Sequence, residues 1–203
     1  AMISTLPELY SRHDALTDPG VLAGLYDDLP DGLSALRDIV SYLIVHVSWA
    51  ARYGISPDTP MPRDTQPVSD RLKLIPAMFP GPVEVDRSPE KRASGGCRDD
   101  SLMLCSILRQ RSIPARVRCG FATYFGVGPF EDHWICECWS AEARRWIRVD
   151  AQQVPQPRGH RVWRSARSRD PCSRVFRRRD RQAEGDCSSS PDPSMGITKP
   201  LSI

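Results

Sequence analysis

Three residues of this chain have side chains that could together act on a carbonyl group. Cys97 lies in a Gly-Gly-Cys-Arg-Asp-Asp segment, His133 precedes a tryptophan, and Asp150 ends a Trp-Ile-Arg-Val-Asp segment. A thiolate is a strong nucleophile, an imidazole can take its proton, and a carboxylate can orient the imidazole. The three residue types in this order predict a Cys-His-Asp triad. We expect no metal ion or other cofactor, because this chemistry needs none.

The residues after Cys97 predict a helix that would activate its thiol. Apolar residues recur at three- and four-residue spacing between Leu102 and Leu108, and Pro114 follows the end of this pattern. We expect a helix of about four turns with Cys97 in the first turn. Backbone N–H groups there lack a helical acceptor and the helix dipole favours negative charge, so both features stabilise a thiolate.

Three segments with alternating apolar residues predict an antiparallel sheet after this helix. They lie at about residues 115–125, 133–139 and 144–150. A four-residue loop at 140–143 would pair Trp139 with Arg144. In that register His133 lies directly opposite Asp150 on the same face, with Cβ atoms roughly 5 Å apart. The spacing therefore predicts a hydrogen bond between the imidazole and the carboxylate.

These spaced elements resemble the transglutaminase-like superfamily. The resemblance rests on Gly-Gly-Cys-Arg-Asp, Ile-Pro-Ala-Arg, Cys-Gly-Phe, Asp-His-Trp and Trp-Ile-Arg-Val-Asp, in this order within residues 90–153. It is closest to a bacterial branch that also carries a helical N-terminal part. The resemblance implies a papain-type α+β fold, in which the nucleophile helix packs on an antiparallel sheet. It matches Cys97 to the nucleophile, His133 to the base and Asp150 to the orienting carboxylate.

The resemblance also implies acyl transfer on a protein or peptide amide through a thioester. Water as the acceptor would give peptide hydrolysis or deamidation, and an amine would give transamidation; the sequence leaves this choice open. Because the superfamily includes members that have lost the cysteine, a noncatalytic protein-binding module is the alternative. Retention of all three triad residues argues against it. We expect no membrane partner, and the sequence leaves the oligomeric state open.

The N-terminal region predicts helices that would cover the sheet or line the substrate cleft. The expected helices span about residues 17–29, 31–53 and 69–79. Asp31 would cap the second helix and Gly54 would end it, whereas Pro76 would interrupt the third. His46 falls inside the second helix among apolar residues, and we expect it to be a core residue with satisfied hydrogen bonds rather than a ligand.

The seven cysteines lack the spacing of a disulfide framework or a zinc site. Cys105 and Cys119 occupy apolar positions and are expected in the core, and Cys136 and Cys138 are expected to be packed thiols on one strand face. An odd number of cysteines without such spacing favours reduced thiols and a cytoplasmic location. We find no pattern of a signal peptide or of a membrane-spanning segment.

The composition of the chain changes near its C-terminal end. Residues 151–203 carry eleven basic and five acidic residues, whereas the first 150 carry seventeen and twenty. We therefore expect a helical part at 1–82, a catalytic core at 83–154 and a disordered tail at 155–203. A shifted reading frame would explain this tail as well as selection would. We do not expect nucleic acid as a partner, although the arginine cluster of the tail could bind it nonspecifically.

Overall fold

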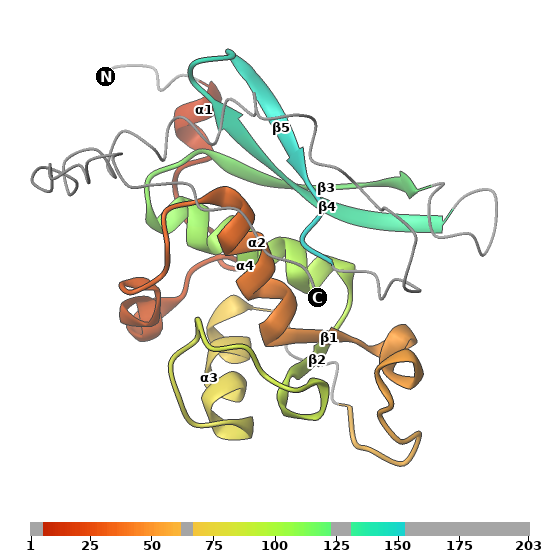
Figure 1. Cartoon of the computed structure of the whole chain (residues 1–203). Coiled ribbons are helices and arrows are strands. Elements are labelled where there is room, and N and C mark those ends of the chain that lie inside the picture. Colours follow the sequence, from red (N-terminus) through yellow and green to blue (C-terminus); the bar gives the residue numbers. More distant parts are fainter. Residues whose placement is uncertain (1–5, 62–66, 123–130, 153–203) are drawn as a thin grey trace, which may run out of the picture.

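Most elements before the Cys97 helix lie on one side of it and the strands after it lie on the other, while the first short helix lies beside those strands (Figure 1). A computed structural model describes residues 6–61, 67–122 and 131–152. Within these residues, helices and two short parallel strands precede the Cys97 helix, and three antiparallel strands follow it. This arrangement confirms the predicted α+β class with a nucleophile helix packed on an antiparallel sheet. The expected disordered tail lies outside the described residues.

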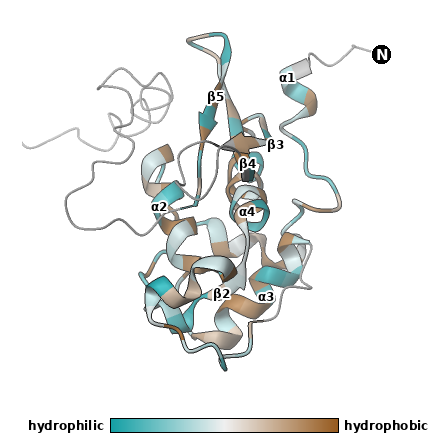
Figure 2. Cartoon of the chain, turned by 90° about the vertical axis from the view of Figure 1, so that its right-hand side faces the viewer, coloured by the Kyte–Doolittle hydropathy of each residue, from teal (hydrophilic) through white to brown (hydrophobic). Residues whose placement is uncertain are grey.

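The N-terminal part is helical, as expected, and its helices bury one apolar side. The colouring in Figure 2 shows apolar and polar residues mixed along α2 and α3, which is the pattern of amphipathic helices. Leu36 and Val40 of α2 and Leu72 and Ile75 of α3 are almost completely buried. The helical elements of this part are α1 (Leu6–Leu9), the 3-10 helices η1 (Gly20–Tyr26) and η2 (Val47–Tyr53), α2 (Leu33–Leu43) and α3 (Val68–Met78).

The prediction of one continuous helix at 31–53 is wrong in the middle of that range. Helix α2 ends at Leu43, and the chain continues as the extended strand β1 (Ile44–His46) before η2 begins. The β-branched residues in this stretch lose side-chain freedom in a helix and fit a strand, where a partner is available. That partner is β2 (Ala93–Gly95), which pairs in parallel with β1. The stop at Gly54 is confirmed, since this residue has a φ of 76°.

The interruption expected at Pro76 is also wrong. Helix α3 runs through Pro76 to Met78. A proline lacks the backbone N–H that would bond to the carbonyl four residues earlier, so it removes one helical hydrogen bond. Because Pro76 lies in the last turn, the helix loses little stability. The N–H of Phe79 still donates a hydrogen bond to the carbonyl of Ile75 at 3.1 Å.

Helix α4 (Cys97–Gln110) forms the centre of the molecule, after the short 3-10 helix η3 (Pro89–Lys91) and β2. Its bounds confirm the predicted helix of about four turns that starts at Cys97. Every residue from Asp99 to Arg109 is buried, because the sheet contacts one side of α4 while α2 and α3 contact others. The sequence pattern predicted only one apolar face, so the burial of this helix exceeds the expectation.

The three expected strands pair in the order β3-β4-β5. The register between the last two differs from the prediction, because Trp139 pairs with Trp146 rather than with Arg144. The loop starts one residue later than expected, and Arg144 closes it with a φ of 47°, a left-handed conformation outside the strand. The Ser140 hydroxyl accepts a hydrogen bond from the Ala143 N–H at 3.1 Å inside this loop. The strands are β3 (Ala115–Ala122), β4 (Glu131–Ser140) and β5 (Arg145–Val149).

Four of the described cysteines test the expectations for packed thiols. Cys105, Cys136 and Cys138 are buried, which confirms the prediction for these three. Cys119 is exposed, so its expected place in the core is wrong. It lies on β3 opposite Trp134 of β4, in a stretch of the strand, residues 118–121, that is exposed throughout. An alternating pattern identifies the two faces of a strand, but it does not show how far along the strand a helix covers one of them.

Candidate active site

Cys97 is held at the start of α4 by tight packing around Gly95 and by a helix cap at Gly96. A Cβ atom on Gly95 would lie 2.8 Å from a methyl carbon of Ile44 and 3.1 Å from the Cβ of Asp99, so only glycine fits there. The backbone N–H of Gly96 donates to the Asp99 carboxylate at 2.8 Å. This is the reciprocal contact of a helix cap and fixes the first turn. Cys97 itself is half-buried and carries a free thiol.

A buried ion pair attaches this helix start to α3. Arg71 on α3 lies 3.1 Å from the Asp99 carboxylate, and both side chains are almost fully buried. The Arg71 guanidinium also donates a hydrogen bond to the backbone carbonyl of Ser94 on β2. One side chain therefore links α3, β2 and α4 next to Cys97. The sequence reasoning missed Arg71, because its partner lies far along the chain and no local pattern marks the pair.

The structure brings His133 and Asp150 together as predicted, although the register is different. The His133 Nε2 lies 3.0 Å from the Asp150 Oδ2. In the observed register Cys136 pairs with Val149, so Asp150 lies beyond the last pair and two positions away from the place directly opposite His133. A shift of two residues keeps both side chains on the same face of the strands, and diagonal neighbours remain within reach of long side chains.

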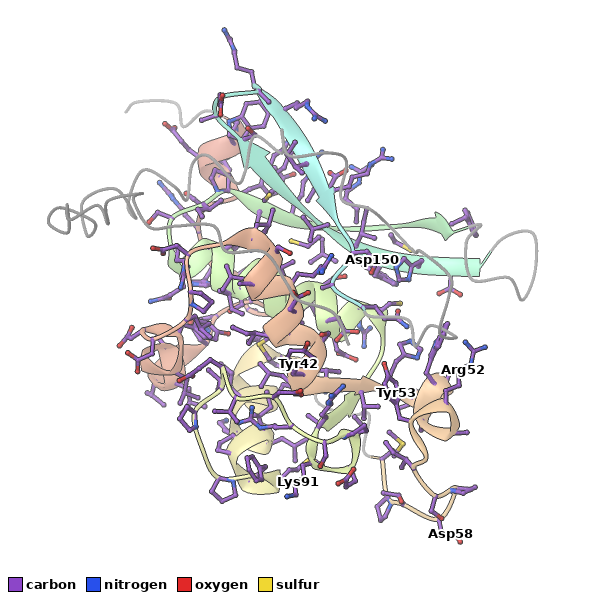
Figure 3. The ribbon with its side chains drawn as sticks, viewed as in Figure 1. Tyr42, Arg52, Tyr53, Asp58, Lys91 and Asp150 are labelled. Atoms are coloured by element: carbon purple, nitrogen blue, oxygen red, sulfur yellow. The ribbon has the colours of Figure 1, made fainter. Side chains whose placement is uncertain are left out.

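The Asp150 carboxylate is held from both sides and stays accessible to solvent. Its Oδ1 accepts the backbone N–H of Gln152 at 3.0 Å, and its side chain is 28% exposed, compared with 4% for His133. Figure 3 shows Asp150 where the chain leaves β5. Since Nε2 of His133 contacts Asp150, Nδ1 is the ring nitrogen left for the Cys97 thiol, with which the imidazole also forms a hydrogen bond.

Three hydrogen bonds make the Cys97 thiol acidic. Burial alone would raise its pKa, but hydrogen bonds from the rings of His133 and His46 and from the backbone N–H of Trp134 lower the pKa from 9.0 to about 6. The same contacts act in the opposite direction on the base. Burial alone would lower the pKa of His133, but its bonds to Asp150 and to Cys97 raise this pKa from 6.5 to about 9. Between about pH 6 and pH 9 the pair therefore rests as thiolate and imidazolium.

His46 is a residue near Cys97 that the sequence reasoning placed wrongly. It ends β1, opposite Gly95 on β2, and its Nε2 lies 3.7 Å from the position that a Cβ of Gly96 would occupy. Its Nδ1 is buried and has no hydrogen-bond partner in the structure as described, so the expected satisfied core histidine is wrong. A strand in place of a helix turns the ring toward the start of α4, and the sequence offered no spacing signal for this contact.

Asp100 is a second acid of the first turn that the structure buries completely. Burial raises its pKa well above the ordinary value, and the nearby charges of Asp99, Asp150 and Cys97 add to this effect. Only a charged carboxylate complements the dipole at a helix N-terminus, so Asp99 fits this role better than Asp100. Tyr53, the last residue of η2 (Figure 3), lies close enough to Asp100 for the two groups to interact electrostatically.

The described residues hold neither a metal-binding group nor a membrane-spanning helix. No group of three or more histidine, cysteine, aspartate or glutamate side chains there could hold a metal ion. In the same residues, no helix combines the length and the apolar character needed to cross a membrane.

Two comparisons with known proteins gave a match. A model of the transglutaminase-like superfamily matches residues 36–151. The crystal structure of a candidate cysteine protease from Cytophaga hutchinsonii superposes with a TM-score of 0.49 and 18% sequence identity, over 74% of this chain and 43% of that protein. The present chain thus corresponds to less than half of that protein's length. No match was found among curated proteins.

Proposed function

The chain belongs to the transglutaminase-like superfamily, and from this premise we propose that it transfers acyl groups from amide substrates through a thioester on Cys97. Membership supports a cysteine-based catalytic activity in general terms. The finer assignment rests on one observation: the His133 imidazole contacts the Asp150 carboxylate at 3.0 Å and also hydrogen-bonds the Cys97 thiol. That is the order of contacts a nucleophile, a base and an orienting carboxylate require.

In the first half-reaction the Cys97 thiolate attacks the carbonyl carbon of an amide. A bond forms between the sulfur and this carbon, and the π electrons of the carbonyl move to its oxygen. The backbone N–H of Cys97 has no acceptor within its own helix, so it can donate a hydrogen bond to the developing oxyanion. The carbonyl then re-forms, the carbon–nitrogen bond breaks, and the His133 imidazolium gives its proton to the leaving ammonia or amine.

In the second half-reaction an acceptor attacks the thioester. Neutral His133 takes a proton from this acceptor, and the thiolate leaves as the acyl group moves to water or to an amine. Asp150 stabilises the imidazolium that forms again. Water as acceptor gives peptide hydrolysis or deamidation, and a lysine amine gives an isopeptide bond. The substrate amide is a peptide bond or a glutamine side chain, with the same chemistry at Cys97.

The test is the capture of an acyl group on Cys97. The full chain and its Cys97→Ala variant would be incubated with p-nitrophenyl acetate, quenched in acid and measured by intact-protein and peptide mass spectrometry. We expect one acetyl group on Cys97 of the parent protein and a burst of p-nitrophenolate that the variant lacks. A peptide mixture with and without a primary amine would then separate cleavage, deamidation and crosslinking.

Two results would contradict the proposal. One is labelling of Cys97 no faster than labelling of Cys119, an exposed cysteine outside the site in the same chain. The other is equal burst kinetics in the parent protein and in Cys97→Ala. Either result would leave the noncatalytic binding module as the better description of this chain.

A further inference from the structure

We propose that His46 is a further catalytic residue, whose Nε2–H donates a hydrogen bond to the oxyanion that forms when Cys97 attacks a carbonyl. This inference rests on the proposed function, because it assigns the second donor of the same oxyanion site. The first donor is the backbone N–H of Cys97. One backbone donor leaves an oxyanion incompletely stabilised, and such sites ordinarily use two or more donors.

The pairing of β1 with β2 brings His46 to this place. The parallel register aligns His46 with Gly95, two residues before the nucleophile. Its Nε2 lies 3.7 Å from the position that a Cβ atom of Gly96 would occupy, next to the start of α4. The ring also hydrogen-bonds the Cys97 thiol. A carbonyl carbon attached to that sulfur would therefore place its oxygen close to both the Cys97 N–H and the His46 ring.

The surroundings of the second ring nitrogen decide which tautomer His46 adopts. Nδ1 is buried and lacks a hydrogen-bond partner in the part of the chain that the structure describes. A buried N–H without a partner is more costly than a lone pair without one, and orphaned donors are rare in proteins. The neutral ring with its proton on Nε2 is thus favoured, and this proton faces the site.

This arrangement differs from that of His133 in one respect that separates their roles. Asp150 lies on the far nitrogen of His133 and stabilises its imidazolium, whereas no ion pair reaches His46 in the described residues. A neutral imidazole can act as an electrophile by donating a hydrogen bond without giving up its proton. His133 moves the proton between sulfur and leaving group, and His46 holds the oxygen.

Neighbouring aromatic packing keeps the His46 ring in position. The ring of Trp49 meets it edge to face, with centroids 6.4 Å apart, and the guanidinium of Arg52 lies 4.0 Å from the centroid of Trp49. Both neighbours belong to η2, and Figure 3 shows Arg52 on that helix, directly after β1. A donor fixed before the reaction needs little reorganisation as the charge develops, which is the condition for effective stabilisation.

The experiment compares two reagents that differ in whether an oxyanion forms. p-Nitrophenyl acetate acylates Cys97 through a tetrahedral oxyanion, whereas iodoacetamide alkylates it by displacement of iodide at a saturated carbon. Both rates would be measured at one pH for the parent chain, His46→Ala and His46→Gln. Any change in the thiolate population affects both reagents, so the ratio of acylation to alkylation isolates the oxyanion contribution.

We expect this ratio to fall between about 10²-fold and 10³-fold in His46→Ala, which is the range for loss of one oxyanion donor. His46→Gln keeps an N–H donor of similar reach and is expected to recover most of the ratio. An unchanged ratio in His46→Ala would overturn the proposal, and so would equal losses in both variants. If the parent chain shows no acylation of Cys97, the proposed function itself is contradicted. This outcome differs from failure of the His46 assignment, because it is seen in the parent chain without any variant.

Discussion

The three-stranded sheet and the two-stranded parallel pair each bring one imidazole to Cys97, but they support it differently. β4 carries His133, whose second ring nitrogen contacts the Asp150 carboxylate at 3.0 Å. β1 carries His46, whose second ring nitrogen is buried without a partner in the structure as described. The group behind an imidazole thus decides what the ring can do: a carboxylate favours a proton carrier, and a buried nitrogen without a partner favours a ring that donates a hydrogen bond and keeps its proton.

The two regions also differ in how they are fastened to the helix between them. Strands β3 and β4 pack extensively on α4, whereas β1 and β2 are only three residues long each and contact this helix much less. On the side of β1 and β2, an ion pair joins Arg71 to Asp99, and Arg71 also donates a hydrogen bond to the Ser94 carbonyl. These contacts make up for the smaller packing of the short strands on α4. A short sheet therefore holds its histidine with the help of one buried arginine.

The largest expected effect is the loss of this arginine. Arg71→Met keeps the length of the side chain but leaves the buried Asp99 carboxylate without its cation, so the free energy of unfolding should fall by about 3–5 kcal/mol. Urea unfolding followed by tryptophan fluorescence would measure it. The double variant Arg71→Met/Asp99→Asn should recover part of the loss, because it removes the unpaired charge. A loss below about 1 kcal/mol in the single variant would show that the parallel pair does not depend on Arg71.

The next prediction distinguishes the effects of His133 and His46 on the pKa of the Cys97 thiol. In His133→Ala the pKa of Cys97 should rise from about 6 toward its ordinary value of 9.0, because both the hydrogen bond and the positive charge of His133 are lost. The wild-type thiolate is present above about pH 6, so the variant should react with iodoacetamide only at higher pH. The measurement is the pH midpoint of alkylation at Cys97 by peptide mass spectrometry.

The midpoint is the useful quantity here, because a thiolate of higher pKa is intrinsically more nucleophilic and partly offsets its lower population. His46→Ala is the matched control for this prediction. It removes a neutral donor and should raise the midpoint less than His133→Ala does. Equal shifts in the two variants would contradict the distinction between a proton carrier and a neutral donor.

The smallest effect concerns the carboxylate behind His133. The raised pKa of His133 means that its imidazolium exists below about pH 9 and is lost as the pH rises through that value. In Asp150→Asn the negative charge is gone, so this pKa should fall by about one to two units. NMR titration of imidazole nitrogens in the labelled full chain would measure it. A His133 titration that stays near pH 9 would mean that Asp150 orients the ring without stabilising its charge.

Local sequence patterns were sufficient to predict the central helix, the order of the three antiparallel strands and the pairing of His133 with Asp150. Helix α4 was predictable because its apolar spacing, its glycines and Pro114 act within a few residues of one another. The hydrogen bond between the histidine and the aspartate survived a wrong register, because a slip of two residues preserves the face of a strand. A slip of one residue would have separated them.

The exact register depended on features that the alternating pattern does not contain. The left-handed Arg144 and the hydrogen bond inside the loop move the turn by one residue. The rings of Trp139 and Trp146, with centroids 5.6 Å apart, form a cross-strand pair in that register. Either loop position fits the alternation equally well, so only the contacts of the folded loop and its strands select one.

The sequence by itself determined which residue is the nucleophile candidate and how its helix begins, because backbone hydrogen bonding and apolar periodicity are local properties. Only the tertiary structure decided what surrounds that nucleophile on its other side. Strand β1 exists because β2 offers it a partner, and Arg71 finds Asp99 across two elements. His46 reaches Cys97 through the same pairing. Contacts between residues far apart in the chain depend on how the elements pack, and a single sequence carries no periodic signal for them.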